Sequence, residues 1–98
     1  MITDEVAMKT VRYEGGAGIG KMGIVNIGDI NKVFAADDTV TIAELKTKGL
    51  LSRKFGRVKI LADGVLDKPL TVKAESFSMQ AIKMIELTGG TVIILRED

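Results

Sequence analysis

The chain has 98 residues, of which 46% are hydrophobic and 28% charged, and its formal net charge is +1. This length suits one small domain and leaves no room for both halves of a dinucleotide-binding fold. Because it contains no Cys and no His, it has no disulfide, thiolate nucleophile, imidazole base or usual zinc site, which excludes most hydrolase mechanisms. We therefore expect no enzyme activity, no catalytic residue, no metal, no cofactor and no small-molecule substrate.

The N-terminal segment, residues 1–23, has acidic residues early, at Asp4 and Glu5, and lacks the apolar core of a secretory signal. No apolar run in the chain approaches the roughly 20 residues that cross a membrane. We expect a cytoplasmic protein with no membrane partner. Glycine is frequent between Gly15 and Gly23, and ordering such backbone is costly, so residues 1–23 are predicted to be flexible.

The stretch GGAGIGKMG matches two nucleotide-binding patterns, G-x-G-x-x-G and most of G-x-x-x-x-G-K. Both patterns require a helix directly after the glycines, because its N-terminus holds the phosphate. Here a β-like segment follows, with a short strand near Val25 and a helical candidate only at residues 29–34. Met22 also stands where a phosphate loop places a hydroxyl for magnesium. We interpret residues 15–23 as a flexible or RNA-facing glycine segment and disfavour nucleotide binding.

Two helices are predicted from their capping residues. Thr41 is followed three residues later by a Glu, which is the capping-box spacing, and the helix over residues 42–48 should end at Gly49. The second helix has the same arrangement, with Ser78 at its N-cap and Gly89 at its end.

Three further segments have the pattern of strands. VKILA and LTVKA alternate apolar and polar residues with a period of two, and TVIIL is a continuous aliphatic run typical of a strand covered on both faces. The predicted order is strand, helix, two strands, helix, strand. We therefore expect a mixed α+β fold, with residues 24–98 as one globular domain after the N-terminal segment 1–23.

Positive charge is concentrated in one part of the chain. Six basic residues and no acidic one lie within fourteen residues: Lys46, Lys48, Arg53, Lys54, Arg57 and Lys59. The rest of the chain has eight bases against thirteen acids, a net charge of about −5. Such a cluster is consistent with a phosphate-backbone site. It is equally consistent with a solvated face whose cations sit favourably at a helix C-terminus.

From Lys59 onward the chain resembles the C-terminal signature of the large-subunit ribosomal protein fifteen family. The matching positions follow in order: Lys59, Ile60, Leu61, Ala62, Gly64, Leu66, Leu70, Val72, Phe77, Ser78, Ala81, Ile85 and Gly89. The resemblance continues upstream through VNIGDI and TIAELKTKGLL, and it covers roughly residues 25–95.

This resemblance implies a small irregular strand-strand-helix superhelix, shared with the relative eighteen-e, and a role as an rRNA-binding structural component of the large ribosomal subunit. Its implied partners are ribosomal RNA and large-subunit ribosomal proteins; it makes no prediction of oligomeric state. The family's basic N-terminal arm is mostly missing, and Arg12 and Lys21 are the candidate RNA contacts left there. The chain then fits a shortened ribosomal protein. The alternative is a non-ribosomal paralogue that acts as a protein-interaction or regulatory module.

Overall fold

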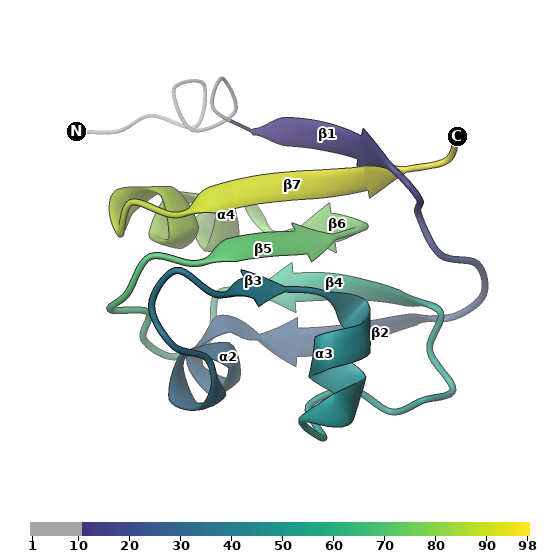
Figure 1. Ribbon diagram of the computed structural model, residues 1–98, viewed down its shortest axis with the longest axis horizontal. Coiled ribbons are helices and arrows are strands. Elements are labelled where there is room, and N and C mark those ends of the chain that lie inside the picture. The colour runs from purple at the N-terminus through teal and green to yellow at the C-terminus, as the bar shows by residue number, and fades with distance from the viewer. Residues whose placement is uncertain (1–10) are drawn as a thin grey trace.

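The structure is a computed structural model that describes residues 11–98 (Figure 1). Within these residues the chain forms seven strands and three helices. In chain order they are β1 (Arg12–Gly15), β2 (Met22–Asn26), α2 (Ile27–Val33), β3 (Thr39–Val40), α3 (Ile42–Thr47), β4 (Arg57–Leu61), β5 (Thr71–Ala74), β6 (Ser76–Phe77), α4 (Met79–Leu87) and β7 (Thr91–Arg96).

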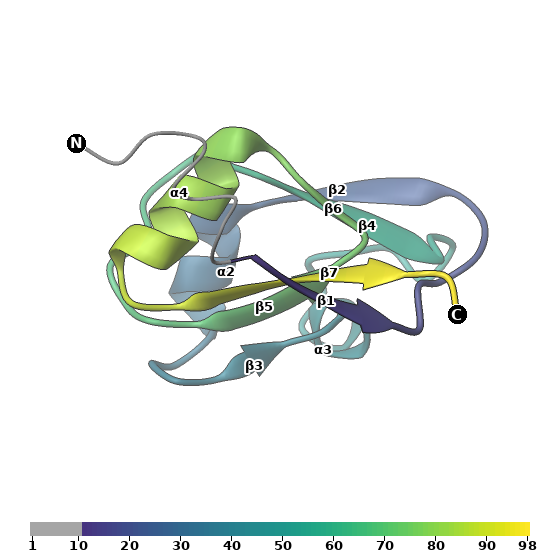
Figure 2. The same cartoon turned by 90° about the horizontal axis from the view of Figure 1, so that it is seen from above.

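The strands form two parallel sheets that face each other. One sheet has the order β1-β7-β5-β3 and the other β2-β4-β6, and every strand pair in them is parallel. Figure 2 shows the two sheets as separate layers, with α2 and α4 toward one end. The chain passes to the other sheet after every strand, so it winds as a superhelix. The expected mixed α+β class, of the strand-strand-helix superhelical kind, is confirmed.

The hydrophobic core lies between the two sheets and under the helices. On β4 the side chains of Val58 and Ile60 are fully buried, and on β5 that of Val72 is fully buried too. Ile85 of α4 and Val92 of β7 complete the same cluster. Burying a side chain of this size contributes about 1.5–3 kcal/mol relative to leaving it in water. The predicted alternation of VKILA and LTVKA is therefore the alternation between this core and the outer face of each sheet.

The predicted helix caps are present. The Thr41 hydroxyl accepts a hydrogen bond from the backbone N–H of Glu44 at 3.2 Å, and the Ser78 hydroxyl accepts one from Ala81 at 3.2 Å. Gly49 and Gly89 follow the two helices in left-handed conformations, with φ of +77° and +85°. Such φ values are costly for residues with a Cβ, which explains why both helices end at glycine.

α2 begins two residues earlier than its predicted position. It starts at Ile27 and contains Gly28, a residue that disfavours helix interiors. A Cβ on Gly28 would lie 2.8 Å from the Cα of Gly64, so glycine at this point lets α2 approach the turn before Leu66. This tertiary contact outweighs the helix propensity, and the sequence pattern does not reveal it.

The segment predicted to be flexible, residues 1–23, contains β1. This strand pairs in parallel with β7, with Arg12 opposite Ile93 and Gly15 opposite Arg96. Residues 1–10 lie outside the described residues, and the mobility of the whole segment stays a prediction.

Candidate nucleic-acid interface

The basic segment, residues 46–59, runs from the last turn of α3 through a loop into β4. The buried side chains of Leu45 and Leu51 hold its first part in place, and the backbone N–H groups of Leu50 and Leu51 both donate to the carbonyl of Leu45. Beyond Leu51 the chain leaves the core, and Arg53 and Lys54 are exposed. The loop thus presents its cations to solvent from a fixed base.

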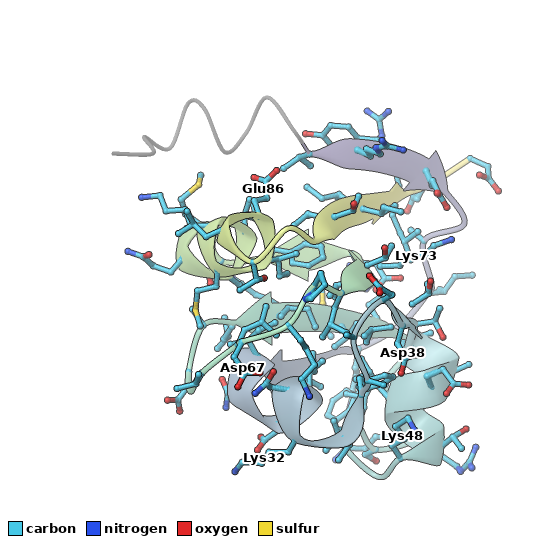
Figure 3. All side chains as sticks on the ribbon, turned by 60° about the vertical axis from the view of Figure 1, so that its left-hand side comes forward. Lys32, Asp38, Lys48, Asp67, Lys73 and Glu86 are labelled. Carbon is cyan, nitrogen blue, oxygen red and sulfur yellow. The ribbon has the colours of Figure 1, made fainter. Side chains whose placement is uncertain are left out.

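Two lysines of the basic segment lie over aromatic rings. The Nζ atom of Lys48 is 5.0 Å from the centroid of the Phe34 ring, and that of Lys54 is 5.1 Å from the Phe55 ring. Such contacts contribute about 0.5–1 kcal/mol at exposed sites and restrict the ammonium groups to a smaller volume. Figure 3 labels Lys48 beside α3.

The glycine segment joins the basic segment through its backbone. We call residues 16–21 the strap. The Arg57 Nε donates to the carbonyl of Gly20 at 2.8 Å, and the carbonyl of Lys21 accepts from the N–H groups of Gly56 and Arg57 at 3.1 and 3.2 Å. An added Cβ on Gly56 would overlap the carbonyl oxygen of Ile19, so the two backbones touch. Lys21 is thereby brought next to Arg57, 36 positions further along the chain.

The carboxylate of Glu75 fastens the strap to the sheets. One oxygen accepts from the N–H of Gly18 at 2.8 Å and the other from the N–H of Val58 at 2.9 Å. An acidic side chain therefore occupies a donor that a bound phosphate would need. The strap also leads into β2 at Met22 rather than into a helix. Both findings agree with the expectation that this segment is not a nucleotide-binding loop.

The cations of the basic segment keep their charge unneutralised within the described structure. Among residues 11–98, the ion pairs within 4.0 Å are Lys32 with Asp29 and Lys73 with Glu14, and none involves the basic segment. Lys21 and Arg12 also have no carboxylate partner there. Because none of these side chains has a carboxylate within 4.0 Å there, each can still bind an external anion.

The six cations do not lie on one flat face. Val58 and Ile60 face the core, so Lys59 between them lies on the outer face of the three-stranded sheet. In Figure 2, α3 lies on the opposite side, next to the four-stranded sheet; it contains Lys46 and ends at its C-cap, Lys48. Arg12 is more distant, because β1 and β3 are opposite edges of that sheet and α3 follows β3. The structure therefore groups Lys21 with the loop and β4 and leaves Arg12 apart.

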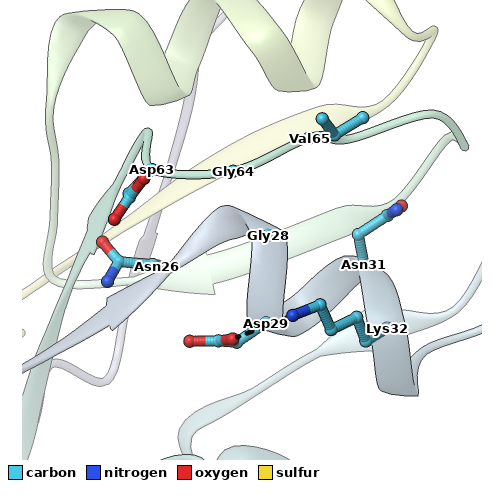
Figure 4. A pocket seen from close by; sticks show the side chains of 8 residues that line it. All are labelled: Asn26, Gly28, Asp29, Asn31, Lys32, Asp63, Gly64 and Val65. Atoms are coloured by element: carbon cyan, nitrogen blue, oxygen red, sulfur yellow. Dashed lines mark ion pairs between the residues drawn. The ribbon is translucent and has the colours of Figure 1, made fainter.

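An open hollow of about 370 Å³ lies elsewhere, between α2 and the turn that precedes Leu66. Its lining is shown in Figure 4, with Val65 and Asn31 at one end and Asn26 and Asp63 at the other. It also contains the Lys32–Asp29 pair, at 3.9 Å, and shares no residue with the basic segment. No local sequence pattern marks this hollow, because it is formed by two segments more than thirty residues apart.

Within residues 11–98, no group of three or more His, Cys, Asp or Glu side chains is arranged to hold a metal ion. In the same part of the chain, no helix is both long and apolar enough to span a membrane. One carboxyl group, that of Glu86 on α4, has its pKa raised by burial. Its Oε1 atom is inaccessible and lacks a hydrogen-bond partner within the described structure.

The fold and its parallel sheets define a small α/β protein with a cluster of cations on its surface, and comparison with known proteins identifies its class. The model of a family of ribosomal proteins that includes 50S-L15 and 50S-L18e matches residues 24–93. The chain belongs to this family of ribosomal proteins, which confirms the resemblance seen in the sequence.

Curated relatives carry the name "Large ribosomal subunit protein uL15". The chain is 46% identical to the protein of Syntrophotalea carbinolica, 44% to that of Pseudothermotoga lettingae and 42% to that of Lactobacillus gasseri. Each alignment has 72 residues and covers 74% of this chain but 49% of the relative. The chain thus spans about half the length of the curated relatives it matches.

Proposed function

We propose that this chain is an rRNA-binding, non-enzymatic structural component of the large ribosomal subunit. Its family and the printed names of its relatives support the ribosomal role. The observation that carries the RNA-binding part is the group of six cations without a carboxylate partner among residues 11–98. Ribosomal RNA and large-subunit ribosomal proteins are then its partners, in the cytoplasm, as part of translation.

The proposed contacts with RNA phosphates are Lys46, Lys48, Arg53, Lys54, Arg57 and Lys59. Lys21 belongs with them, because its carbonyl accepts from the N–H groups of Gly56 and Arg57. Arg12 is a separate contact at the other sheet edge. We also propose residues 24–98 as the globular unit that positions the six cations of the basic segment.

The number of contacts sets the expected salt dependence. Each neutralised phosphate contributes about 0.9 to the slope of log K against log salt for a duplex and about 0.7 for a single strand. Six contacts therefore give a slope of roughly −4 to −5. Because the cations lie on more than one side of the molecule, a short RNA should engage fewer of them and show a smaller slope.

The test is sucrose-gradient fractionation of native cell extract at low and at moderate salt, with detection of the protein in each fraction. We expect it to migrate with the large subunit at both. The variant with Arg53→Gln and Lys54→Gln should leave the subunit at lower salt than the wild type. The control is Lys32→Gln, which removes an exposed cation near the hollow and should leave migration unchanged.

Two results would refute the proposal. One is a protein found only at the top of the gradient at low salt. The other is a stable protein partner that survives nuclease treatment while no RNA is retained, which would instead identify a protein-interaction module.

A further inference from the structure

Ile19, at the centre of the strap, is the most exposed of the large apolar side chains among residues 11–98. It is 91% exposed, whereas the next, Val65, is 66% exposed. Single exposed apolar residues are ordinary on protein surfaces, so exposure alone does not identify a contact. The surroundings of Ile19 supply the further evidence.

The backbone of Ile19 is held on both sides. Before it, the N–H of Gly18 donates to Glu75 at 2.8 Å, and after it, the carbonyl of Gly20 accepts from Arg57 at 2.8 Å. Its own carbonyl packs against Gly56, where no Cβ would fit. The side chain is thus presented outward from a fixed position with a glycine on each side, so it forms a convex apolar tip.

Arg57 lies beside this tip, since its Nε donates to the carbonyl of Gly20, and two lysines lie near it along the chain. Lys21 lies two residues beyond Ile19 in the strap. Lys54 and Arg57 lie close in sequence to Gly56, which the Ile19 carbonyl contacts. None of the three has a carboxylate within 4.0 Å in the described part of the chain, and the Glu75 carboxylate is engaged with backbone donors. An apolar tip within unneutralised positive charge complements a partner with apolar surface between rows of negative charge.

We propose that Ile19 enters the shallow minor groove of an RNA duplex while Lys21, Lys54 and Arg57 bind the phosphates beside it. An RNA helix has a wide, shallow minor groove in which ribose and base edges lie between two phosphate rows. Stacking on unpaired bases instead needs an aromatic ring or another flat face. Ile19 has none, and the one aromatic in the basic segment, Phe55, is half-buried beneath Lys54. This inference rests on the proposed function and adds the form of RNA that is bound.

The experiment compares binding of the protein to a 20-base-pair RNA duplex and to one of its strands alone, over a range of salt concentrations. For the wild type we expect tighter binding to the duplex. Ile19→Ser should weaken duplex binding about tenfold and leave the salt slope unchanged, because it removes apolar contact and no charge. Lys54→Gln should lower the magnitude of the slope by about 0.9. Val65→Ser, an exposed apolar residue of the hollow, is the matched control and should bind as the wild type does.

The results distinguish failure of the proposed Ile19 contact from failure of RNA binding itself, on which that contact rests. If Ile19→Ser binds the duplex as tightly as the wild type while Lys54→Gln still lowers the slope, RNA binding stands and the role of Ile19 is overturned. Tighter binding of the wild type to the single strand than to the duplex would also overturn the role of Ile19. Absence of binding to either RNA removes the proposed function and this inference together. Thermal unfolding of Ile19→Ser should match that of the wild type, because the side chain makes almost no contact within the fold.

Discussion

Replacing Glu75 by Ala should destabilise the fold by loosening the strap. The substitution removes two hydrogen bonds from backbone N–H groups, at 2.8 and 2.9 Å, to a charged acceptor. Hydrogen bonds to charged groups contribute about 1.5–3 kcal/mol each, and partial exposure lets water replace part of this. We expect a loss of about 2 kcal/mol, and about half of that for Glu75→Gln, which keeps one acceptor oxygen.

Thermal unfolding followed by circular dichroism measures this loss. For a domain of 60–100 residues, 1 kcal/mol corresponds to roughly 4–8 °C, so Glu75→Ala should lower Tm by about 8–16 °C. Hydrogen exchange should also speed up at the amides of Gly18 and Val58, the two donors. The control is Glu97→Ala, which removes an exposed carboxylate without a hydrogen bond in the described residues. A Tm for Glu75→Ala equal to that of the control would show that the reasoning about the strap is wrong.

Three further predictions concern stability. Glu86→Gln should raise Tm at pH 7.5, because burial raises the pKa of this carboxyl and its ionised form therefore opposes folding; the gain should shrink as the pH is lowered through the folded-state pKa. Thr41→Ala and Ser78→Ala should each cost about 1 kcal/mol in urea denaturation, since each removes a helix N-cap bond. Gly56→Ala should cost about 2 kcal/mol or more in the same assay, because the new Cβ overlaps a backbone oxygen that cannot rotate away.

Each of these three predictions can be contradicted by a specific result. A gain from Glu86→Gln that is equal at pH 4 and pH 7.5 would mean that ionisation of Glu86 is not its cause. A double cap variant as stable as the wild type would remove the energetic role of the caps. For Gly56→Ala the control is Gly16→Ala, where φ is +98° but no atom lies within 4 Å of the added Cβ. Because the φ of Gly56 is not in the left-handed region, the loss expected there comes from overlap alone, and a Gly56→Ala variant as stable as the wild type would refute it.

Features whose physical causes are close together in the chain were predictable. The caps of α3 and α4 depend on a side chain and an N–H three residues apart, so Thr41 and Ser78 indicated both helices. Apolar and polar residues alternate in β4 because every second side chain faces the core. For the candidate site, the basic segment could be found from the sequence, because it is defined by its many Lys and Arg residues and its lack of Asp and Glu.

Features that depend on distant contacts were not predictable. The hydrogen bond between Gly18 and Glu75 joins residues 57 positions apart, and no local sequence pattern predicts it. β3 and β6 have two residues each, too few for a periodicity. β1 is exposed along its whole length and therefore lacks the alternation that marks a half-buried strand. The position of Lys21 beside Arg57, and the resulting exposure of Ile19, follow from these contacts and were missed for the same reason.

Because successive strands alternate between the two sheets, strand pairing is delayed while the chain is being synthesised. Among the strands of residues 11–98, none pairs with its immediate neighbour in sequence, so these strands form no hairpin that could act early as a template. β1 leaves the ribosome first among these strands, yet its partner β7 is the last to be synthesised. Such non-local pairing slows folding, because a long loop must close before the contact is made. During synthesis β1 therefore remains without its partner until β7 has emerged, and only then can β7 pair with β1 on one edge and β5 on the other.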